Sequence, residues 1–360
     1  MIDAADDLLE RVWADYGDAR RITAITEVSA NVSTNRVYRL RLDGGSTRDA
    51  GDAAGQGDEV YAKVSSYGSY FLFVEDHDRI HRCVEELRST RFDGMLADVL
   101  TRDKRIYTWY DQRQWVVLYR GVERRRSLGR ILGDGEIEQL AREIAEFHLA
   151  CAELAPRLPL TSKSIKSDAI HLLDLLESPF ASRNFQLPPE HIGVLRRHTH
   201  DFLVRLDEMH YDYWAKIPVL IDWNLGNFSV TGDGDDFRLF SRWDYDWFRI
   251  EPRLLDFYFL SRVSSRTGDR TQFTYASHTL TEPRFQRFIS AYHQVMPLSA
   301  DEIRFLPEVY RFFILNYVIR EGARFFRPDY CATFRHHAVT RYLPELERLD
   351  ISPLLDLIRT

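Results

Sequence analysis

Two aspartates and an asparagine within residues 217–247 have the types and spacing that could hold a divalent cation. Asp222 follows an apolar run, and Asn227 comes five positions later. A second apolar segment starts directly after Asn227, and the segment that returns from it ends just before Asp244. Carboxylate and amide oxygens are the hard ligands that Mg²⁺ prefers, and a further carboxylate could orient a hydroxyl group for attack on a phosphate.

The residues between these three predict a β-hairpin with the candidate side chains at its open end. Residues 232–235, Gly-Asp-Gly-Asp, form a strong turn signal between two strand-like segments. Because rigid strands flank both sites, the two carboxylates and the amide should lie close together. Phosphoryl transfer needs such a set, although Asp and Asn are also common residues of ordinary turns.

The first third of the chain is predicted to contain strands and one helix. Residues 43–58 are rich in Gly, Asp and Ala and predict a long hairpin loop, because they offer nothing to bury. The apolar spacing from about Val74 to Leu87 predicts the helix. The expected strands cover residues 22–28, 36–42, 59–64, 105–109 and 114–119.

From Ser127 onward the apolar residues follow a helical period instead. The β-like segment from Ile217 to Asp246 is the exception. We therefore expect a β-rich N-terminal domain, residues 1–121, and a mainly helical C-terminal domain, residues 122–360. The expected helices cover residues 137–148, 168–178, 190–214, 283–295, 301–322 and 334–348.

Composition narrows the class of protein. The 360 residues are long enough for two packed lobes, and 44% of them are hydrophobic, so a sizeable core is expected. The formal net charge of −7 lacks the basic footprint of a nucleic-acid-binding protein. Three separated cysteines, no signal-peptide pattern and no apolar run of membrane-spanning length predict a cytoplasmic protein without a membrane partner.

In its motifs the sequence resembles the aminoglycoside phosphotransferase and choline-kinase-like superfamily. The catalytic loop of that family reads H-G-D-x-x-x-x-N, and residues 220–227 read L-I-D-W-N-L-G-N. Its metal aspartate lies in an I-D-[WF]-E/D segment, which residues 243–247, W-D-Y-D-W, resemble. Residues 251–256, E-P-R-L-L-D, are similar to the D-P-x-x-D-L segment of the family.

This resemblance implies an α+β, protein-kinase-like two-lobed fold with a β-rich N-lobe and a mainly helical C-lobe. It implies ATP and Mg²⁺ as cofactors, Asp222 as the catalytic residue, and Asn227 and Asp244 as metal ligands. The expected activity is phosphorylation of a hydroxyl on a small polar molecule such as an aminoglycoside, an aminoalcohol or a sugar-like compound. The expected partners are therefore a nucleotide and a small-molecule acceptor.

Three further segments resemble the nucleotide-binding elements of the family. Residues 61–64, Y-A-K-V, are similar to the strand whose lysine contacts the phosphates, and residues 29–40 to the hairpin that covers them. Residues 115–123, W-V-V-L-Y-R-G-V-E, are similar to the linker that accepts adenine. The nucleotide-binding residues implied in this way are Lys63, Ser29, Asn31, Ser33, Leu118, Gly121 and Val122. For the acidic partner of the lysine, Asp76 is preferred over Glu75 and Glu85.

The sequence departs from the family pattern at Leu220 and Ile221, which stand where the family has His and Gly. This departure motivates the main alternative, a catalytically inactive pseudokinase that binds nucleotide or serves as a scaffold. A metal-dependent hydrolase is a second alternative, and a protein-directed kinase or a nucleotidyl transferase are variants within the same fold.

Other polar and aromatic residues have a structural interpretation. His148 closes an apolar helical stripe and is interpreted as a packed histidine, and Asp256 as a buttress of the catalytic loop. The aromatic residues 243–248 are interpreted first as core and second as the lining of a substrate pocket. Acidic residues in 201–212 and 244–251 suggest a cationic acceptor.

Overall fold

The computed structural model describes residues 4–29, 35–43, 59–66, 68–269 and 275–359, apart from the side chain of Phe325. The chain forms two compact units. The N-terminal unit contains Met1–Arg124 and Ser241–Trp243, and the C-terminal unit contains Arg125–Phe240 and Asp244–Thr360. Within the described part of the chain, no helix combines the length and the apolar character needed to cross a membrane.

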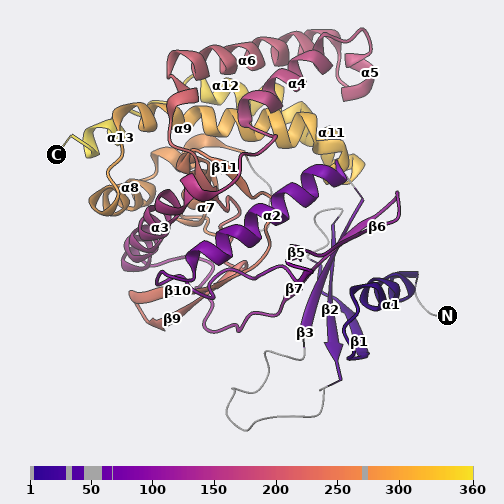
Figure 1. The fold of residues 1–360 in the computed structure, drawn as a ribbon. Helices are drawn as coiled ribbons and strands as arrows, with labels where there is room; N and C mark the ends of the chain where they lie inside the picture. Colours follow the sequence, from indigo (N-terminus) through magenta and orange to yellow (C-terminus); the bar gives the residue numbers. More distant parts are fainter. Residues whose placement is uncertain (1–3, 30–34, 44–58, 67, 270–274, 360) are drawn as a thin grey trace. The chain divides into compact units, whose positions relative to one another are not determined.

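A five-stranded antiparallel sheet is the centre of the N-terminal unit, with the strand order β1-β2-β3-β7-β6 (Figure 1). The expected strands are confirmed, except that residues 105–106 pair with a separate short strand. The elements are α1 (Ala4–Tyr16), β1 (Ile22–Glu27), β2 (Arg36–Leu42), β3 (Glu59–Ser65), α2 (Tyr70–Leu87), β4 (Thr101–Arg102), β5 (Arg105–Ile106), β6 (Thr108–Tyr110) and β7 (Trp115–Arg120).

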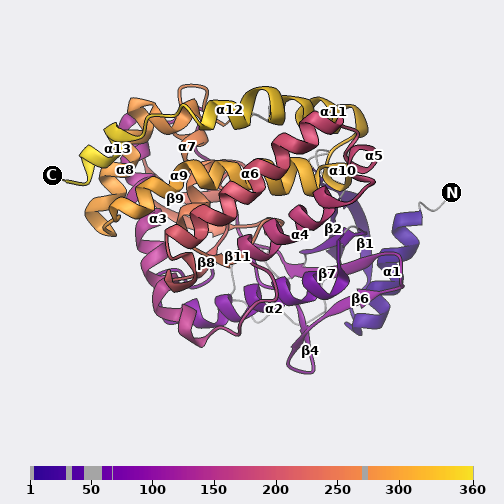
Figure 2. The same cartoon turned by 90° about the horizontal axis from the view of Figure 1, so that it is seen from above.

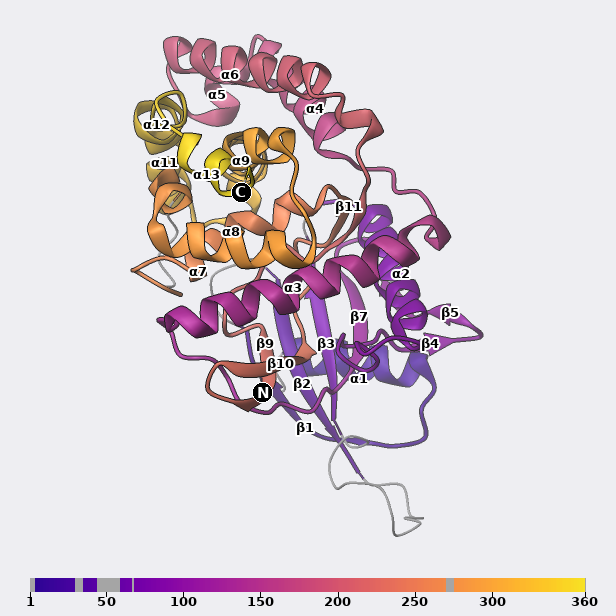
Figure 3. The ribbon, with the colours of Figure 1, turned by 90° about the vertical axis from the view of Figure 1, so that its left-hand side faces the viewer.

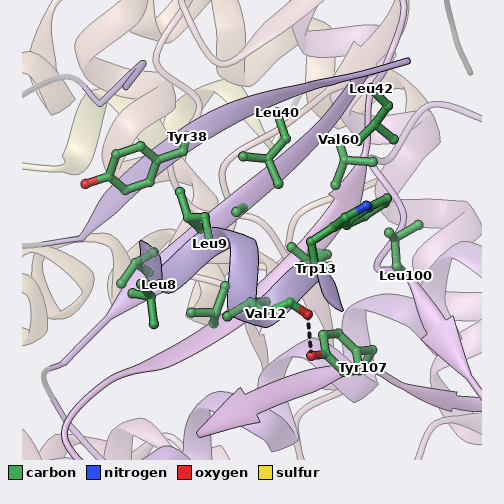
Figure 4. Close-up of a cluster of buried hydrophobic side chains, with 14 residues drawn as sticks. Leu8, Leu9, Val12, Trp13, Tyr38, Leu40, Leu42, Val60, Leu100 and Tyr107 are labelled. Atoms are coloured by element: carbon green, nitrogen blue, oxygen red, sulfur yellow. Dashed lines mark hydrogen bonds between the residues drawn. The ribbon is translucent and has the colours of Figure 1, made fainter. Parts of the chain in front are cut away.

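Helix α1 packs on one face of this sheet, and its presence corrects the prediction of a single helix in this part of the chain. The helix buries the side chains of Leu9, Val12 and Trp13. Val12 and Trp13 follow Leu9 by three and four residues, so the three side chains lie along one face of the helix. Figure 4 shows these side chains in contact with residues of β2 and β3. The Tyr107 hydroxyl donates to the Val12 carbonyl at 2.9 Å and ties the helix to the chain before β6.

Helix α2 packs on the opposite face and confirms the helix expected at residues 74–87. Phe73 lies 6.2 Å from Trp115 between ring centroids, and His77 lies 5.7 Å from Tyr119. Because side chains alternate along a strand, the residue of β3 that pairs with Val117 lies on this same face. That residue is Lys63.

The C-terminal unit is mainly helical, as expected, and its described residues include two short strand pairs. Helix α3 packs along α8, and α4 packs along α6 (Figures 2 and 3). The elements are α3 (Asp134–Leu154), η1 (Ala155–Arg157), α4 (Ile165–Glu177), α5 (Ala181–Phe185), α6 (Pro189–Glu208), η2 (Tyr211–Tyr213), β8 (Ile217–Val219), β9 (Phe228–Asp233), β10 (Asp236–Arg242), β11 (Arg249–Glu251), η3 (Arg253–Asp256), α7 (Phe257–Val263), η4 (Ser277–Thr281), α8 (Pro283–Val295), α9 (Ala300–Phe313), η5 (Ile314–Arg320), α10 (Gly322–Phe325), α11 (Pro328–His337), η6 (Ala338–Tyr342), α12 (Leu343–Leu346) and α13 (Ser352–Leu357).

The long helices α6, α8 and α9 begin where local sequence signals place them. Helix α9 starts with a capping box, in which the Ser299 hydroxyl accepts the Glu302 amide and the Glu302 carboxylate accepts the Ser299 amide. Proline stands in the first turn of both α6 and α8, where its missing N–H costs no hydrogen bond. The helix expected over 301–322 changes to π-helical geometry from Ile314 onward.

Candidate active site

Two strand pairs of the C-terminal unit are followed or preceded by the predicted catalytic and metal residues. Strands β9 and β10 form the expected hairpin, so Asn227 before β9 and Asp244 after β10 lie at its open end. Strand β8 pairs with β11, with Val219 opposite Arg249. The chain after β8, which carries Asp222, and the chain before β11, which carries Asp244, therefore meet at the same end of that pair.

A compact set of backbone hydrogen bonds shapes the candidate catalytic loop, residues 220–227. The Asp222 amide donates to the Leu220 carbonyl at 2.7 Å, and the Trp223 amide donates to the Ile221 carbonyl at 2.8 Å. The Asn227 amide donates to the Asn224 carbonyl at 2.9 Å and closes the last turn. These short-range bonds fold the loop into consecutive tight turns that fix where its side chains point.

Ile221 adopts a backbone φ of +63°, which is uncommon for a β-branched residue and costs about 1–2 kcal/mol. The family pattern has Gly at this position, and Gly adopts positive φ without strain. Ile221 thus adopts a conformation in which glycine would be free of strain. The Ile221 side chain is fully buried, and its packing offsets the strain.

A chain of buried hydrogen bonds holds the backbone amide of Ile221. The Ile221 amide donates to Asp256 Oδ1 at 2.6 Å, and His148 Nε2 lies 2.8 Å from Asp256 Oδ2. The carboxylate accepts the Nε2–H, so His148 Nδ1 accepts from the Tyr292 hydroxyl, which lies 2.7 Å away. His148 and Asp256 are both fully buried, which agrees with the structural roles expected from the sequence.

Two charged residues beside the loop were not identified from the sequence. The Asp269 carboxylate accepts the Leu225 amide at 2.8 Å. Arg262 of α7 is half-buried against the rings of Tyr258 and Phe259. Desolvation opposes the charge of Arg262, but nearby tyrosines and, to a smaller extent, Asp222 raise its pKa above the ordinary value, so the group remains a cation. Both residues follow the last recognisable motif, in a segment whose sequence has no distinctive signal.

The donor set at the open end of the hairpin suits Mg²⁺. Asp244 is exposed and has a φ of +67°, a conformation that Asp tolerates better than most residues. Asn227 Nδ2 donates to the Asp222 carbonyl at 3.4 Å, which identifies the nitrogen end of the amide. The oxygen end of Asn227 and the Asp244 carboxylate are both hard oxygen ligands, the type that Mg²⁺ requires.

Beyond Asp244 the chain enters a buried group of charged and aromatic residues. The Trp247 ring lies 3.8 Å from the Tyr317 ring between centroids, and the Arg249 Nε donates to the Tyr317 hydroxyl at 3.2 Å. Asp168 accepts from Arg249, and Arg320 lies 2.8 Å from its other oxygen. Burial raises the pKa of Asp168, but the two guanidinium groups outweigh burial and lower it overall.

This group changes the interpretation of the acidic residues proposed for a cationic acceptor. Glu251 is fully buried, where it accepts from the Tyr211 hydroxyl at 2.6 Å and from the Ile165 amide at 2.8 Å. Asp212 is exposed and lies 2.5 Å from Lys166. Glu251 is therefore a structural residue, and the burial of Trp247 agrees with the core interpretation of the aromatic segment.

In the N-terminal unit, Lys63 is buried in the middle of β3, with 5% of its surface exposed. A buried lysine needs an anionic partner, because desolvation disfavours an isolated ammonium group. It lies on the sheet face that α2 covers. On α2, Asp76 is half-buried and stands three residues after Phe73 and four before Ile80, both on the sheet-facing side.

Of the residues expected in the phosphate-covering hairpin, Asn31 and Ser33 lie outside the described residues. Ser29 is described, and its hydroxyl accepts the Val37 amide at 2.9 Å and donates to Glu27 at 3.0 Å. These bonds close the base of the hairpin between β1 and β2. The Ser29 hydroxyl is thus engaged in holding the hairpin together.

The linker residues have different environments. The Leu118 side chain is fully buried in the core beneath α1, so it contributes to packing. Gly121 and Val122 follow the end of β7 and are half-buried. The Gly121 amide donates to the Glu59 carbonyl at 3.3 Å, and a side chain at this position would press on that carbonyl.

One other group of metal-type ligands occurs among the described residues of the N-terminal unit. His81, Glu85 and Asp98 have ligand atoms within 4.8 Å of one another. His81 Nδ1 lies 2.8 Å from Asp98, and Glu85 lies 2.5 Å from Arg88. Since these groups pair with each other and with an arginine, we interpret them as an ion-pair cluster that ties α2 to the segment before β4.

The elements of each unit form a protein-kinase-like fold, which solved structures of small-molecule kinases share. No protein-family model matches the sequence, and no match was found among curated proteins. Solved structures do match over nearly the whole chain. An amicoumacin kinase in complex with AMP-PNP, Ca²⁺ and Ami covers 97% of this chain and 95% of its own, with a TM-score of 0.60 at 13% identity.

A microcompartment-associated aminopropanol kinase matches with a TM-score of 0.58 at 15% identity, covering 98% of this chain and 99% of its own. The gentamicin complex of APH(2")-IIa matches with a TM-score of 0.55 at 13% identity and the same coverage. The chain therefore has the fold of the aminoglycoside phosphotransferase and choline-kinase-like superfamily, as the motifs predicted. At these identities the likeness concerns the fold alone.

Proposed function

We propose that this protein is an ATP- and Mg²⁺-dependent phosphotransferase that phosphorylates a hydroxyl group of a small polar molecule. The proposal is supported by the strand pairing, which places the segments that carry Asp222, Asn227 and Asp244 at the adjoining ends of β8/β11 and β9/β10. Phosphoryl transfer requires one carboxylate for the acceptor hydroxyl and oxygen ligands for the metal. The kinases that share the fold act on small molecules, which supports the same class of acceptor here.

In this proposal each residue has the role that the family resemblance implies. Asp222 orients the acceptor hydroxyl and accepts its proton, and the guanidinium group of Arg262 supplies positive charge on the same side of the C-terminal unit. Asn227 and Asp244 hold the cation. When bound with ATP, Mg²⁺ supplies positive charge at the phosphate oxygens. Catalysis then depends on positioning and on charge stabilisation, with little covalent work for the side chains.

From the N-terminal unit we propose Lys63 for the phosphates, with Asp76 as its partner. Ser29, Asn31 and Ser33 belong to the proposed phosphate cover, where backbone amides of a tight turn can bind anions. The backbone at Gly121 and Val122 is proposed to accept the adenine. Leu118 would support that segment from the core, since its side chain is fully buried.

The first experiment is calorimetric titration of the protein with ATP, with and without Mg²⁺, repeated on Asp244→Ala. Binding that requires Mg²⁺ and weakens in the variant supports the proposal. Asp233→Ala is the matched control, because Asp233 is an exposed carboxylate at the turn of the same hairpin. Nucleotide binding without turnover of any acceptor would favour the pseudokinase, and binding of the metal without nucleotide would favour the hydrolase.

Turnover is then measured on a panel of amino sugars, aminoalcohols and neutral sugars. We expect Asp222→Ala and Asp244→Ala to fold like the wild type and to lower turnover by orders of magnitude. The Asp233→Ala control should retain full turnover. Near-wild-type turnover in either active-site variant would show that this loop does not carry the chemistry.

A further inference from the structure

The catalytic loop is held from outside at two backbone amides, each by a carboxylate from a later segment. The Ile221 amide donates to Asp256 at 2.6 Å, and the Leu225 amide donates to Asp269 at 2.8 Å. Asp256 lies in a segment that resembles a known motif, whereas Asp269 lies after helix α7 and matches none. The second anchor therefore needs a separate explanation.

The position of Asp269 is itself tightly fixed. Its amide donates to the Arg130 carbonyl at 2.8 Å, and the preceding Gly268 donates to Ser265 at 3.1 Å. Gly268 has a φ of +60°, and a side chain there would collide with the Arg130 carbonyl oxygen. Only glycine allows the backbone to pass this close to Arg130, so the turn places Asp269 with little freedom.

Leu225, whose amide contacts Asp269, lies in the turn that determines the position of Asn227. Leu225 is buried, with 3% of its surface exposed, and it is a central residue of the turn closed by the Asn227 amide and the Asn224 carbonyl. A shift of the Leu225 backbone would move Asn227 relative to Asp222. Errors of about 1 Å in such positions can lower turnover by roughly 100-fold.

We propose that Asp269 is a positioning residue of the catalytic loop, whose carboxylate fixes the turn that presents Asn227 to the metal. This inference rests on the proposed function for the role of Asn227, but the hydrogen bond itself can be tested without turnover. The role requires a hydrogen-bond acceptor, and it does not require a negative charge. Asp269→Asn should therefore retain the hydrogen bond to the Leu225 amide, whereas Asp269→Ala should lose it.

The test compares Asp269→Ala with Asp269→Asn in two measurements. The first is amide hydrogen exchange at Leu225, which we expect to be slow in the wild type and in Asp269→Asn and roughly 10-fold faster in Asp269→Ala. The second is the Mg²⁺ concentration needed for ATP binding, which we expect to rise roughly 10-fold in the alanine variant. Asp111→Ala is the control, since Asp111 also accepts backbone amides, from Arg113 at 3.0 Å and Gln114 at 2.8 Å.

A further variant, Gly268→Ala, is designed to displace Asp269 without removing its carboxylate. Gly268→Ala should give the same faster exchange at Leu225, because the added methyl group pushes the turn away from Arg130. Gly234→Ala is the matched control: Gly234 also has a positive φ, of +54°, but a methyl group there meets nothing within 4 Å. This control carries the backbone strain and should leave the exchange at Leu225 unchanged.

The outcomes separate this inference from the proposed function. If Asp269→Ala changes neither the exchange at Leu225 nor the Mg²⁺ requirement, the positioning role is overturned while nucleotide binding stands. If the wild type binds no Mg²⁺-ATP, the proposed function fails, and the exchange measurement alone decides whether Asp269 holds the loop. Equal loss of protection in the asparagine and alanine variants would also contradict the role assigned to the acceptor oxygen.

Discussion

His148 and Asp256 form a hydrogen bond of 2.8 Å in which neither side chain is exposed to solvent. Their segments lie 108 residues apart in the sequence, on α3 and η3. The second carboxylate oxygen of Asp256 accepts the Ile221 amide. The candidate catalytic loop is thus connected through buried polar groups to the long helix α3, and removing Asp256 breaks the connection.

We expect Asp256→Ala to lower the free energy of unfolding by about 3–5 kcal/mol, because it leaves the buried Ile221 amide and the buried Nε2–H of His148 without an acceptor. Urea unfolding followed by fluorescence measures the change. Asp301→Ala removes an exposed carboxylate that pairs with Arg304, and it should change stability by less than about 1 kcal/mol. Equal effects of the two substitutions would show that the chain of buried hydrogen bonds contributes no special stability.

The strain at Ile221 can be measured by substituting two small residues at the same position. Ile221→Ala and Ile221→Gly both remove a buried side chain and should destabilise by about 2–5 kcal/mol. Glycine, however, adopts a φ of +63° freely, so it should be about 1 kcal/mol more stable than alanine here. Urea unfolding of both variants gives the difference directly.

The control for this comparison is Ile217, which is also buried but lies in strand β8. There glycine should be about 0.5–1 kcal/mol less stable than alanine, since it loses more conformational freedom on folding. The order of the two variants should therefore reverse between the two positions. The same order at both positions would mean that the left-handed conformation of Ile221 carries no measurable strain.

Much of the fold could be predicted from the sequence because its signals are local. The hairpin around residues 232–235 and the helical period of the C-terminal unit each depend on neighbouring residues. Helix α1 was missed because its acidic first turn and short apolar stripe resemble an ordinary chain end, although Leu9, Val12 and Trp13 carry the required spacing. The short helix α7 lacks a period long enough to detect.

The candidate site was predictable only where motif residues are adjacent in the chain. Asp222, Asn227 and Asp244 could be proposed together because one hairpin connects them. Asp269 could not, because its role arises from the approach of a separate loop, for which Gly268 is the sole local signal. The burial of Leu118 was also not evident, since the face of a strand that meets α1 depends on tertiary packing.

His198 predicts a dependence of stability on pH. Burial, and then Arg311 and Arg197, lower the pKa of His198 to about 4. In the unfolded chain the His198 imidazole has a pKa near 6.5. Between pH 6.5 and pH 4 the imidazole is therefore protonated in the unfolded chain and neutral in the folded chain, which favours unfolding. The contribution of neutral His198 to the free energy of unfolding is fully present above pH 6.5 and is lost as the pH falls toward 4.

On acidification from pH 7 to pH 5 we expect the titration of His198 to lower the free energy of unfolding by about 2 kcal/mol. Urea unfolding at the two pH values measures the loss in the wild type and in His198→Gln, whose amide cannot take up the proton. The variant should lose less stability on acidification than the wild type. A parallel loss in both proteins would assign the acid sensitivity to other groups, among them Glu308 and Glu347 near His198 and Arg311.

Lys63 and Asp76 provide the last prediction, which concerns nucleotide affinity. Lys63 lies on the sheet face covered by α2, and Asp76 stands on the sheet-facing side of that helix. If Asp76 orients Lys63 toward the phosphates, Lys63→Met and Asp76→Asn should weaken ATP binding by similar factors of roughly 10 to 100. Isothermal titration calorimetry with Mg²⁺-ATP measures both affinities.

Glu75 is the matched control because it is also half-buried and adjacent in sequence, but it lies about 100° around the helix from Asp76. Glu75→Gln should therefore leave ATP affinity unchanged. The double variant Lys63→Met/Asp76→Asn should bind no more weakly than Lys63→Met alone, because both substitutions remove one interaction. Additive losses, or a loss in Glu75→Gln equal to that in Asp76→Asn, would assign the partner of Lys63 to another acidic residue.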